Sequence, residues 1–325
     1  MSMDKISKIP VTVLSGFLGA GKTTLLNRIL TEKHGVRYAV IVNEFGEVGI
    51  DNELIIDADE EILEMNNGCV CCTIRGDLIR TLNNLIERPD RLDAIIIETT
   101  GLADPGPIAK VFFSDQQISH NTKLDAIVTI VDALHLERQL VEHLEIKEQI
   151  AFADVVLINK IDLVAPPKIE DMNKIINNIN PQANLIQTIR CNAPLFELLN
   201  IGAFSLESVL NVKPEPAVHG RMNKHDSNVS SVSLLSDKPL DIDKFQSWFG
   251  ELLQTRGNDI LRSKGVIEFS GLDERYVFQG VHMLMEASPM GAWPDDCERI
   301  SRMVFIGRHL ESMGLDEGFR SCQAN

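Results

Sequence analysis

Continuous apolar runs recur along the first two thirds of the chain. They lie at residues 10–15 (PVTVLS), 38–45 (YAVIVNEF), 93–99 (DAIIIET), 124–133 (LDAIVTIVDA), 153–160 (ADVVLINK) and 183–189 (ANLIQTI). Strands that are apolar on both faces are typical of a parallel sheet covered by helices on each side. Segments of helical character, such as 22–33 and 169–179, stand between these runs. The alternation predicts a doubly wound, mostly parallel α/β domain.

The pattern changes after residue 210. Residues 211–228 (NVKPEPAVHGRMNKHDSN) are polar, contain two prolines and show no apolar period, which predicts a linker. Beyond it, residues 229–235 alternate like a half-exposed strand, and Asp241 is placed to cap a helix. One face of that helix would carry Ile242, Phe245, Trp248, Phe249 and Leu252. Short strands are expected at 264–269, 275–281 and 302–307. We therefore expect a domain at 1–210, the linker at 211–228 and a smaller α+β domain with an antiparallel sheet at 229–325.

Composition narrows the possible partners. The chain has 325 residues, enough for two domains, and a formal net charge of -16. Such an acidic chain repels nucleic acid and anionic lipid, so we expect neither as a partner. No apolar run approaches the ~18 residues of a membrane span, and the N-terminus lacks a secretory pattern. The six cysteines fit a reducing compartment, which predicts a cytoplasmic protein.

Residues 16–23 (GFLGAGKT) match the phosphate-loop pattern G-x-x-x-x-G-K-[ST], between an expected strand and an expected helix. Glycines in such a loop let backbone N–H groups converge on phosphate oxygens, and the helix N-terminus adds its positive end. Lys22 would reach the β- and γ-phosphates, and the Thr23 hydroxyl would bind Mg²⁺. A chance glycine turn is the alternative, and the strand–loop–helix context argues against it.

Two further motifs follow buried strands. In AIIIETTG (94–101), Glu98 would hold a Mg²⁺-bound water or orient the attacking water, and the Gly101 N–H would contact the γ-phosphate. In LINKID (157–162), Asp162 would accept two hydrogen bonds from guanine, which favours GTP over ATP. Asn159 and Lys160 would contact the purine. Lys22 and Glu98 are the catalytic candidates. The candidates for nucleotide binding are Gly16, Gly19, Ala20, Gly21, Lys22, Thr23, Thr24, Gly101, Asn159, Lys160 and Asp162.

Three cysteines lie within four residues in the segment NNGCVCC, at Cys69, Cys71 and Cys72. Thiolates suit Zn²⁺ and other soft ions, and three of them plus one further ligand complete a tetrahedron. The spacing differs from the C-x-x-C of a zinc finger. Buried apolar thiols or a redox pair are the alternatives. Cys191, Cys297 and Cys322 are isolated, and we expect them to be core or incidental thiols.

The acidic segment 43–57 (NEFGEVGIDNELIID) lies between the phosphate loop and the cysteines. It follows the second strand, where GTPases keep a nucleotide-sensing switch. Glu47 is the best candidate for the fourth metal ligand, with Glu44 behind it, although either residue alone is more often a solvated acid.

Five segments together resemble the CobW-type GTPases, which are similar to metal chaperones. The segments are GFLGAGKTT, NEFGEVGID, NGCVCC, ETTGLADP and NKID, and the resemblance covers the whole chain. Within that family the chain looks most similar to the bacterial YjiA-like branch, although it lacks a histidine-rich linker. The resemblance implies GTP hydrolysis coupled to metal delivery, with Cys69, Cys71 and Cys72 as the metal-binding motif. The cofactors implied are GTP, Mg²⁺ and Zn²⁺, and the partner is a client metalloprotein, with a homo-oligomer also possible.

Two classes of function remain open at this point. The first is a GTP-hydrolysing zinc metallochaperone. The second is a regulatory GTPase whose cysteines hold a structural zinc. A nickel- or cobalt-insertion GTPase is a variant of the first class, and it ranks lower because such proteins typically lack a separate domain like residues 229–325.

Overall fold

A computed structural model describes residues 8–32, 35–42, 61–64, 72–89, 92–210, 229–294 and 298–324. At 61–64 and 72–74 it describes the backbone alone. The chain divides into two compact units. The first comprises Met1–Ile175 and Ala183–Ala203, and the second comprises Ile176–Gln182 and Phe204–Asn325.

The first unit is built on a seven-stranded sheet in the order β3-β2-β4-β1-β5-β6-β7, with every neighbouring pair parallel. The strands are β1 (Ile9–Gly16), β2 (Tyr38–Val42), β3 (Glu61–Glu64), β4 (Ala94–Glu98), β5 (Thr122–Asp132), β6 (Val155–Asn159) and β7 (Asn184–Gln187). The six apolar runs are all strands, so the doubly wound sheet is confirmed. Strand β3 was not predicted, because EILE is only four residues long and carries a glutamate at each end, so it forms neither a long apolar run nor an alternating pattern.

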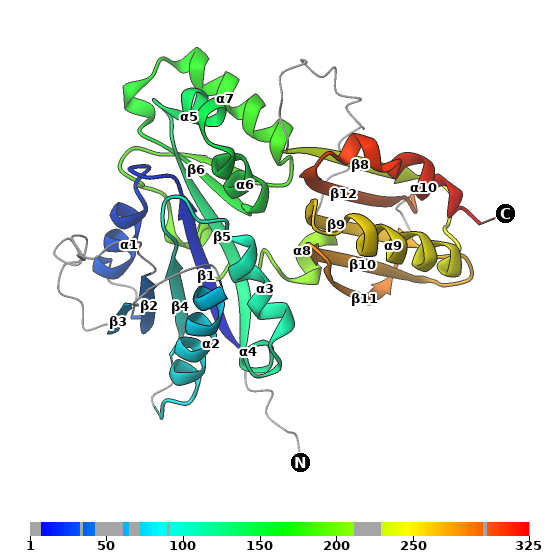
Figure 1. Ribbon diagram of the computed structural model, residues 1–325, viewed down its shortest axis with the longest axis horizontal. Coiled ribbons are helices and arrows are strands. Elements are labelled where there is room, and N and C mark those ends of the chain that lie inside the picture. Colours follow the sequence, from blue (N-terminus) through cyan, green and yellow to red (C-terminus); the bar gives the residue numbers. More distant parts are fainter. Residues whose placement is uncertain are drawn as a thin grey trace. The chain divides into compact units, whose positions relative to one another are not determined.

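Helices fill the connections between these strands (Figure 1). They are α1 (Lys22–Thr31), α2 (Cys72–Ile86), α3 (Gly106–Ser114), α4 (Gln116–Asn121), α5 (Leu136–Glu142), α6 (Leu144–Phe152) and α7 (Pro166–Ile179), with the short 3-10 turns η2 (Ile161–Leu163) and η3 (Leu195–Glu197). Leu25, Leu26 and Ile29 bury one face of α1 against Leu14 and other residues of the central strands. The apolar period of the sequence thus becomes the core that fixes the phosphate loop at the start of α1.

A buried carboxylate holds the segment where the chain leaves the first unit. Asp125 of β5 is fully buried and accepts hydrogen bonds from the backbone N–H groups of Gly202 (2.7 Å) and Ile201 (3.2 Å). The Thr12 hydroxyl donates a third, at 3.3 Å. Asn200 and Gly202 have positive φ angles of 55° and 62°, so the turn is tightly coiled around the carboxylate. Asp125 therefore anchors residues 200–202 to the middle of the sheet.

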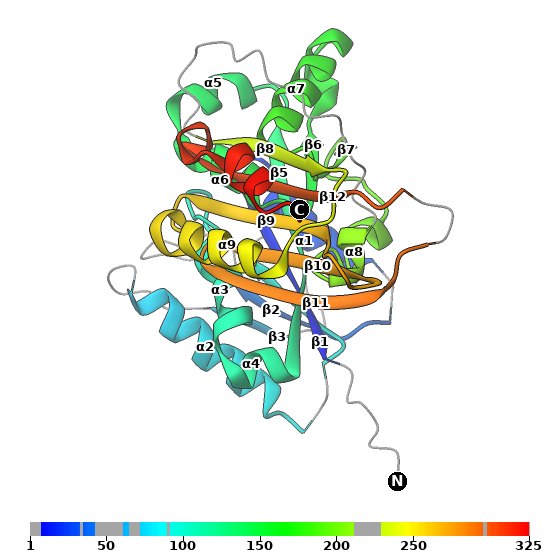
Figure 2. The same ribbon diagram turned by 90° about the vertical axis from the view of Figure 1, so that its right-hand side faces the viewer.

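The second unit contains an antiparallel sheet in the order β11-β10-β9-β12-β8. Its strands are β8 (Val229–Ser236), β9 (Ile260–Glu268), β10 (Glu274–Val281), β11 (Leu284–Ala292) and β12 (Ser301–Arg308). Its helices are α8 (Leu206–Leu210), α9 (Ile242–Arg256) and α10 (Leu315–Ser321), with a 3-10 turn η4 (Leu310–Met313). Figure 2 shows α9 and α10 on the same face of this sheet. The predicted α+β domain is confirmed, while β11, which contains Pro289 and is largely exposed, was not predicted.

The helix expected after Asp241 is present, and the Asp241 side chain accepts from Lys244 N–H at 3.0 Å. Phe245, Phe249 and Leu252 are buried, and Ile242 and Trp248 pack against the same core. Within the described ranges, every helix is too short or too polar to span a bilayer.

Replacing Asp125 by Asn should destabilise the chain at neutral pH by about 1–3 kcal/mol, because the amide presents one acceptor oxygen to several donors. Burial raises the pKa of Asp125 against the opposing effect of its hydrogen bonds. The folded chain binds this proton more tightly than the unfolded chain, so protonation of Asp125 stabilises the fold. This contribution is complete below the ordinary carboxyl pKa and is lost as pH rises through the raised pKa of the folded state.

The gap in unfolding free energy between parent and variant should thus be wider at about pH 4.5 than at about pH 7. Urea unfolding followed by circular dichroism measures both gaps. A gap that does not change with pH would contradict the assignment.

Candidate functional site

The phosphate loop lies where the sequence places it. β1 ends at Gly16 and α1 begins at Lys22. Gly16, Gly19 and Gly21 all have positive φ angles, at 137°, 74° and 122°. A Cβ atom at Gly21 would lie 2.6 Å from the Asn159 amide nitrogen, so only glycine fits there. The loop therefore turns sharply and directs the N-terminus of α1 to the carboxyl edge of the sheet, where anions bind.

Lys22 and Thr23 lie at the first turn of α1. Lys22 is 8 % exposed, and its ammonium donates to the carbonyl oxygens of Gly16 (2.9 Å) and Phe17 (3.4 Å) of its own loop. The Thr23 hydroxyl donates to Glu98 Oε1 at 3.2 Å. Thr24, the next residue, is exposed. The structure therefore brings the predicted Mg²⁺ ligand Thr23 to the predicted catalytic Glu98.

The second motif approaches the same loop from β4. Glu98 is the last residue of β4 and is buried, and Thr99 N–H donates to Leu14 O at 3.0 Å. A Cβ atom at Gly101 would lie 2.6 Å from the backbone nitrogen of Leu18. Gly101 thus packs directly against the phosphate loop, and no larger residue fits without displacing it.

The buried amide of Asn159 connects the third motif to the other loops. Its Nδ2 donates to Ala20 O (3.0 Å), and its Oδ1 accepts from Cys191 N–H (2.9 Å) and from the Thr188 hydroxyl (3.2 Å). Asn159 is 2 % exposed, so these bonds are shielded from water. The sequence predicted that Asn159 touches the purine, whereas in this structure its side chain links the loops around the site.

Lys160 and Asp132 form an ion pair at the same edge. Lys160 has a left-handed backbone (φ 63°), and its ammonium donates to Asp132 Oδ2 (2.7 Å) and to Gly19 O (2.8 Å). Leu134 N–H and His135 Nδ1 also contact the Asp132 carboxylate, at 2.8 and 3.1 Å. Burial raises the pKa of Asp132, but these hydrogen bonds outweigh burial, and the pKa lies below its usual value. The pair holds the Lys160 stem in place.

Sequence reasoning missed Asp132. The signal was an acid at the end of a long buried strand, the same feature that pointed to Glu98. Asp162 lies in η2, two residues beyond Lys160, and is exposed. The carboxylate expected to recognise the base is therefore open to solvent, while its neighbours fix the backbone that carries it.

Cys191 also contributes to this region. It is fully buried in the core that α1 covers, as expected for a core thiol, and its Sγ lies 3.4 Å from Gly21 O. The Arg28 guanidinium donates to the carbonyl oxygens of Cys191, at 2.9 Å, and of Ala193. Burial raises the pKa of the Cys191 thiol to about 11. The segment 188–193 therefore packs against the phosphate loop and the start of α1.

The predicted metal site falls mostly outside the described residues. Glu47, Cys69 and Cys71 lie outside them, and Cys72 is described by its backbone only, as the first residue of α2. Among the described residues, no group of three His, Cys, Asp or Glu side chains is placed to hold a metal ion. The metal-binding role of the three cysteines stays a prediction.

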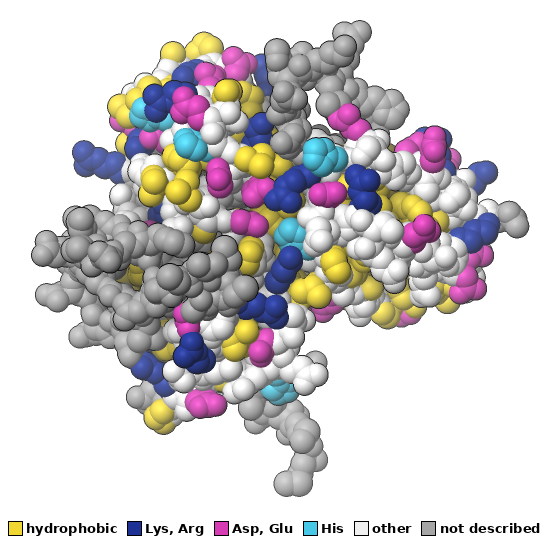
Figure 3. Space-filling model, in the orientation of Figure 1, with side chains coloured by type: hydrophobic (Ala, Val, Ile, Leu, Met, Phe, Trp, Pro, Cys, Tyr) yellow, Lys and Arg dark blue, Asp and Glu magenta, His cyan; other side chains and the backbone are white. Residues whose placement is uncertain are grey.

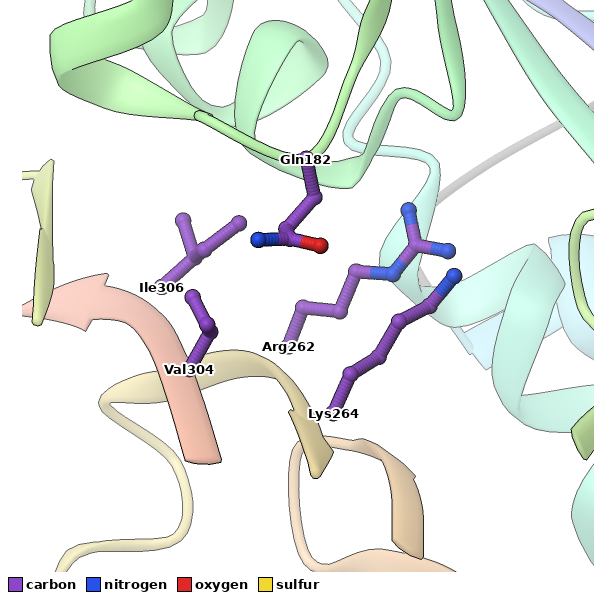
Figure 4. A pocket seen from close by; sticks show the side chains of 5 residues that line it. All are labelled: Gln182, Arg262, Lys264, Val304 and Ile306. Atoms are coloured by element: carbon purple, nitrogen blue, oxygen red, sulfur yellow. The ribbon is translucent and has the colours of Figure 1, made fainter. Parts of the chain in front are cut away.

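The second unit also contains a small pocket (Figure 4). It is lined by Gln182, Arg262, Lys264, Val304 and Ile306. The Arg262 guanidinium lies 4.4 Å from the centre of the Phe204 ring, and the Lys264 ammonium lies 5.8 Å from it. The cavity volume is about 10 Å³, far below the 300–1,000 Å³ of usual ligand pockets. This pocket is therefore too small for a nucleotide.

A parallel sheet with a phosphate loop after β1, an acid after β4 and an Asn-Lys-x-Asp motif after β6 defines a P-loop nucleotide-binding protein of the GTPase type. Residues 10–187 match the CobW/HypB/UreG nucleotide-binding domain, and residues 229–323 match the cobalamin synthesis protein cobW C-terminal domain. The chain belongs to the CobW family of GTPases.

Similar proteins cover nearly the whole chain. The zinc chaperone YjiA of Escherichia coli is 37 % identical, over 97 % of this chain and 98 % of its own length. The zinc chaperone CobW of Pseudomonas aeruginosa is 32 % identical, over 100 % of this chain and 94 % of its own. The crystal structure of zinc-bound YjiA GTPase from Escherichia coli superimposes with a TM-score of 0.82 at 32 % identity, covering 98 % of this chain and 100 % of that one. The family resemblance and both predicted domain folds are confirmed.

The buried thiol of Cys191 should resist alkylation in the folded protein. A pKa near 11 instead of 9.0 lowers the thiolate fraction at neutral pH about 100-fold, and burial blocks the reagent as well. Iodoacetamide labelling with mass spectrometry of each cysteine peptide measures the rates. The unfolded chain in denaturant is the control, and there Cys191 should react like an ordinary thiol. Fast labelling of Cys191 in the native protein would show that segment 188–193 is not packed against the phosphate loop.

Proposed function

We propose that this protein hydrolyses GTP and uses the nucleotide to control the binding and delivery of zinc to a client metalloprotein. The observation that carries the proposal is the meeting of three loops at one edge of the sheet, through Thr23 with Glu98, Gly101 with Leu18, and Asn159 with Ala20. The family supports the GTPase activity, and the relatives named as zinc chaperones support the cargo.

Guanine recognition is assigned to Asp162. Its carboxylate would accept from the N1–H and the amino group of guanine, a pair of donors that adenine lacks. The Lys160 stem would lie along the purine, and its ion pair with Asp132 limits the stem to one orientation. Asn159 would contribute by fixing the loop as well as by touching the ring.

Phosphate binding is assigned to the loop 16–24. Backbone N–H groups of Gly19, Ala20, Gly21 and the start of α1 would surround the phosphates. The Lys22 ammonium, now on the loop's own carbonyl oxygens, would exchange them for the β- and γ-phosphate oxygens. Gly101 N–H would donate to the γ-phosphate from the facing turn.

The oxygen atoms at this site suit Mg²⁺, because the Thr23 hydroxyl and the Glu98 carboxylate lie 3.2 Å apart and both are hard ligands. Thr23 would bind the ion directly, and Glu98 would orient a water at it or the attacking water. When bound, Mg²⁺ supplies positive charge to the β- and γ-phosphate oxygens. Glu98 is buried at a strand end, so its position is fixed before the substrate arrives.

Zinc is the proposed cargo. Cys69, Cys71 and Cys72 would hold it as thiolates, and Glu47 would complete a tetrahedral site. Cys72 opens α2, and a helix N-terminus favours the thiolate form. Glu47 lies in the expected switch segment 43–57, so the nucleotide state would decide whether the fourth ligand is in place. A reducing compartment such as the cytoplasm suits the site because its thiols stay unoxidised.

The partners follow from the same reasoning. Delivery needs a client metalloprotein, and self-association into a homo-oligomer is compatible with the proposal. In the described part of the face in Figure 3, basic and acidic side chains are interspersed. The chain as a whole carries a net charge of -16, which disfavours nucleic acid as a partner. We assign the GTPase activity to a domain at 1–210 and leave residues 229–325, beyond the linker 211–228, as the second domain.

Replacing Glu98 by Gln should lower kcat for GTP hydrolysis on the order of 100-fold while changing the affinity for a GTP analogue much less. The amide keeps the size of the side chain but cannot accept a proton from water. Phosphate release and analogue titration give the two quantities. A variant with the parent's kcat would make Glu98 a structural residue only.

Zinc affinity should depend on the nucleotide. We expect the GTP-analogue state to bind zinc more tightly than the GDP state by about 1–3 kcal/mol, and zinc must then strengthen analogue binding by the same factor. Competition with a chelator in the nucleotide-free, GDP and analogue states measures this. Affinity should also fall as pH is lowered, since thiols must lose protons to bind the metal.

The matched control for the cysteine motif is Cys322→Ser, a buried free thiol of the second unit. Cys71→Ser with Cys72→Ser should abolish tight zinc binding, and Cys322→Ser should not. Equal zinc affinity in all three nucleotide states would favour the regulatory GTPase with a structural zinc instead.

A further inference from the structure

A small polar cluster lies beside the turn that follows β4. It consists of Ser15, Thr99, Thr129 and Gln149, each at most 1 % exposed. Ser15 and Thr129 are register partners in β1 and β5, and the Thr129 hydroxyl donates to the backbone carbonyl of Gln149 in α6 at 2.9 Å. Side chains alternate along a strand, so these hydroxyls occupy the face opposite to Leu14 and Glu98. The Thr129 hydroxyl therefore joins α6 to β5, beside Ser15 of β1.

Gln149 holds the turn that contains Gly101. Its Nε2 donates to Gly101 O at 3.0 Å and to Ala103 O at 3.2 Å, so both amide protons are used on one turn. The turn's own closing bond runs from Ala103 N–H to Thr100 O at 3.1 Å. The side chain of one α6 residue thus fixes the backbone of residues 101–103, next to the N–H assigned to the γ-phosphate.

The residue preceding α6 contacts the other phosphate-binding element. The His143 ring lies 4.5 Å from the ring of Phe17, centroid to centroid, and Phe17 belongs to the phosphate loop. α6 therefore touches both loops, through His143 at its start and through Gln149 in its second turn.

Three polar atoms of the cluster have no hydrogen-bond partner among the described residues: Gln149 Oε1, Ser15 Oγ and Thr99 Oγ1. Buried polar atoms are nearly always paired, so each exception needs an explanation. Thr99 lies two residues before Gly101, and Gln149 is bonded to the turn. A shift of the turn when Gly101 N–H meets a γ-phosphate would let these unpaired atoms find partners.

We propose that Gln149 is a positioning residue for Gly101 and that α6 is the helix that responds to the γ-phosphate. The proposal rests on the GTP site proposed above. Gln149 sets the orientation of the 101–103 turn, which selects GTP over GDP, since only GTP has the phosphate that Gly101 would contact. Movement of the turn is transmitted to α6 through the same amide.

Gln149→Met keeps the length of the side chain and removes both donors. We expect the ratio of GTP-analogue affinity to GDP affinity to fall about 10-fold, through weaker analogue binding with GDP binding unchanged. kcat should fall more than KM rises. The control is Thr129→Val, which removes the hydrogen bond from the Thr129 hydroxyl to Gln149 O while leaving the Gln149 amide on the turn. It should keep the parent's affinity ratio.

Hydrogen–deuterium exchange of residues 144–152 in the unmodified chain gives a second measurement that needs no variant. The analogue, compared with GDP, should change exchange in α6, and Gln149→Met should remove that difference while α1 still responds. An unchanged affinity ratio in Gln149→Met, an equal loss in Thr129→Val, or α6 exchange that is identical with GDP and analogue would each overturn the proposal. Failure of the unmodified chain to bind GDP or analogue would instead reject the GTP site itself.

Discussion

The nucleotide site depends on the buried amide of Asn159. Its bonds to Ala20, Thr188 and Cys191 join the phosphate loop, the base-recognition loop and the segment after β7. Leaving a buried amide without a partner costs free energy, so displacing one of these loops also destabilises the positions of the others. Gly21 permits the close approach to Asn159 and Cys191, and the ion pair of Lys160 with Asp132, together with the bond of Lys160 to Gly19 O, ties the same loops. The loops proposed to bind the phosphates and the base are thus held as one unit.

Much of the fold follows from local sequence. Six buried runs became the strands of the parallel sheet, and Asp241 with its apolar helix face marked the second domain. These elements were predictable because a strand buried on both faces is a continuous apolar run, and a helix buried on one face has apolar residues at helical spacing. Strands β3 and β11 lack such patterns. β3 is short and charged at both ends, and β11 is an exposed edge strand containing proline.

Sequence motifs supply the candidate residues Lys22, Thr23 and Asp162, whose roles stay predictions. Contacts at the site between residues that are distant in sequence were not predictable from such motifs. Asp132 is 28 residues from Lys160, and Gln149 is 48 from Gly101. From the sequence, Cys191 was predicted to be an isolated thiol. Its contacts at the site are a backbone N–H bonded to Asn159 and a thiol packed against Gly21 of the phosphate loop, and neither is visible in a local pattern. Such roles depend on which strands become neighbours, and local pattern does not specify that.

The carboxylate of Asp125 has a mechanical consequence. It ties residues 201 and 202 to β5, a strand with parallel neighbours β1 and β6 on its two sides. Tension on the chain beyond Ala203 therefore meets these hydrogen bonds before it reaches β7, the edge strand that precedes this segment along the chain. The bonds to Asp125 must break before the load passes to β7, which could then be peeled from the sheet one hydrogen bond at a time. The carboxylate thus acts as a clamp that shields an edge strand of the first unit from force applied through its own C-terminal continuation.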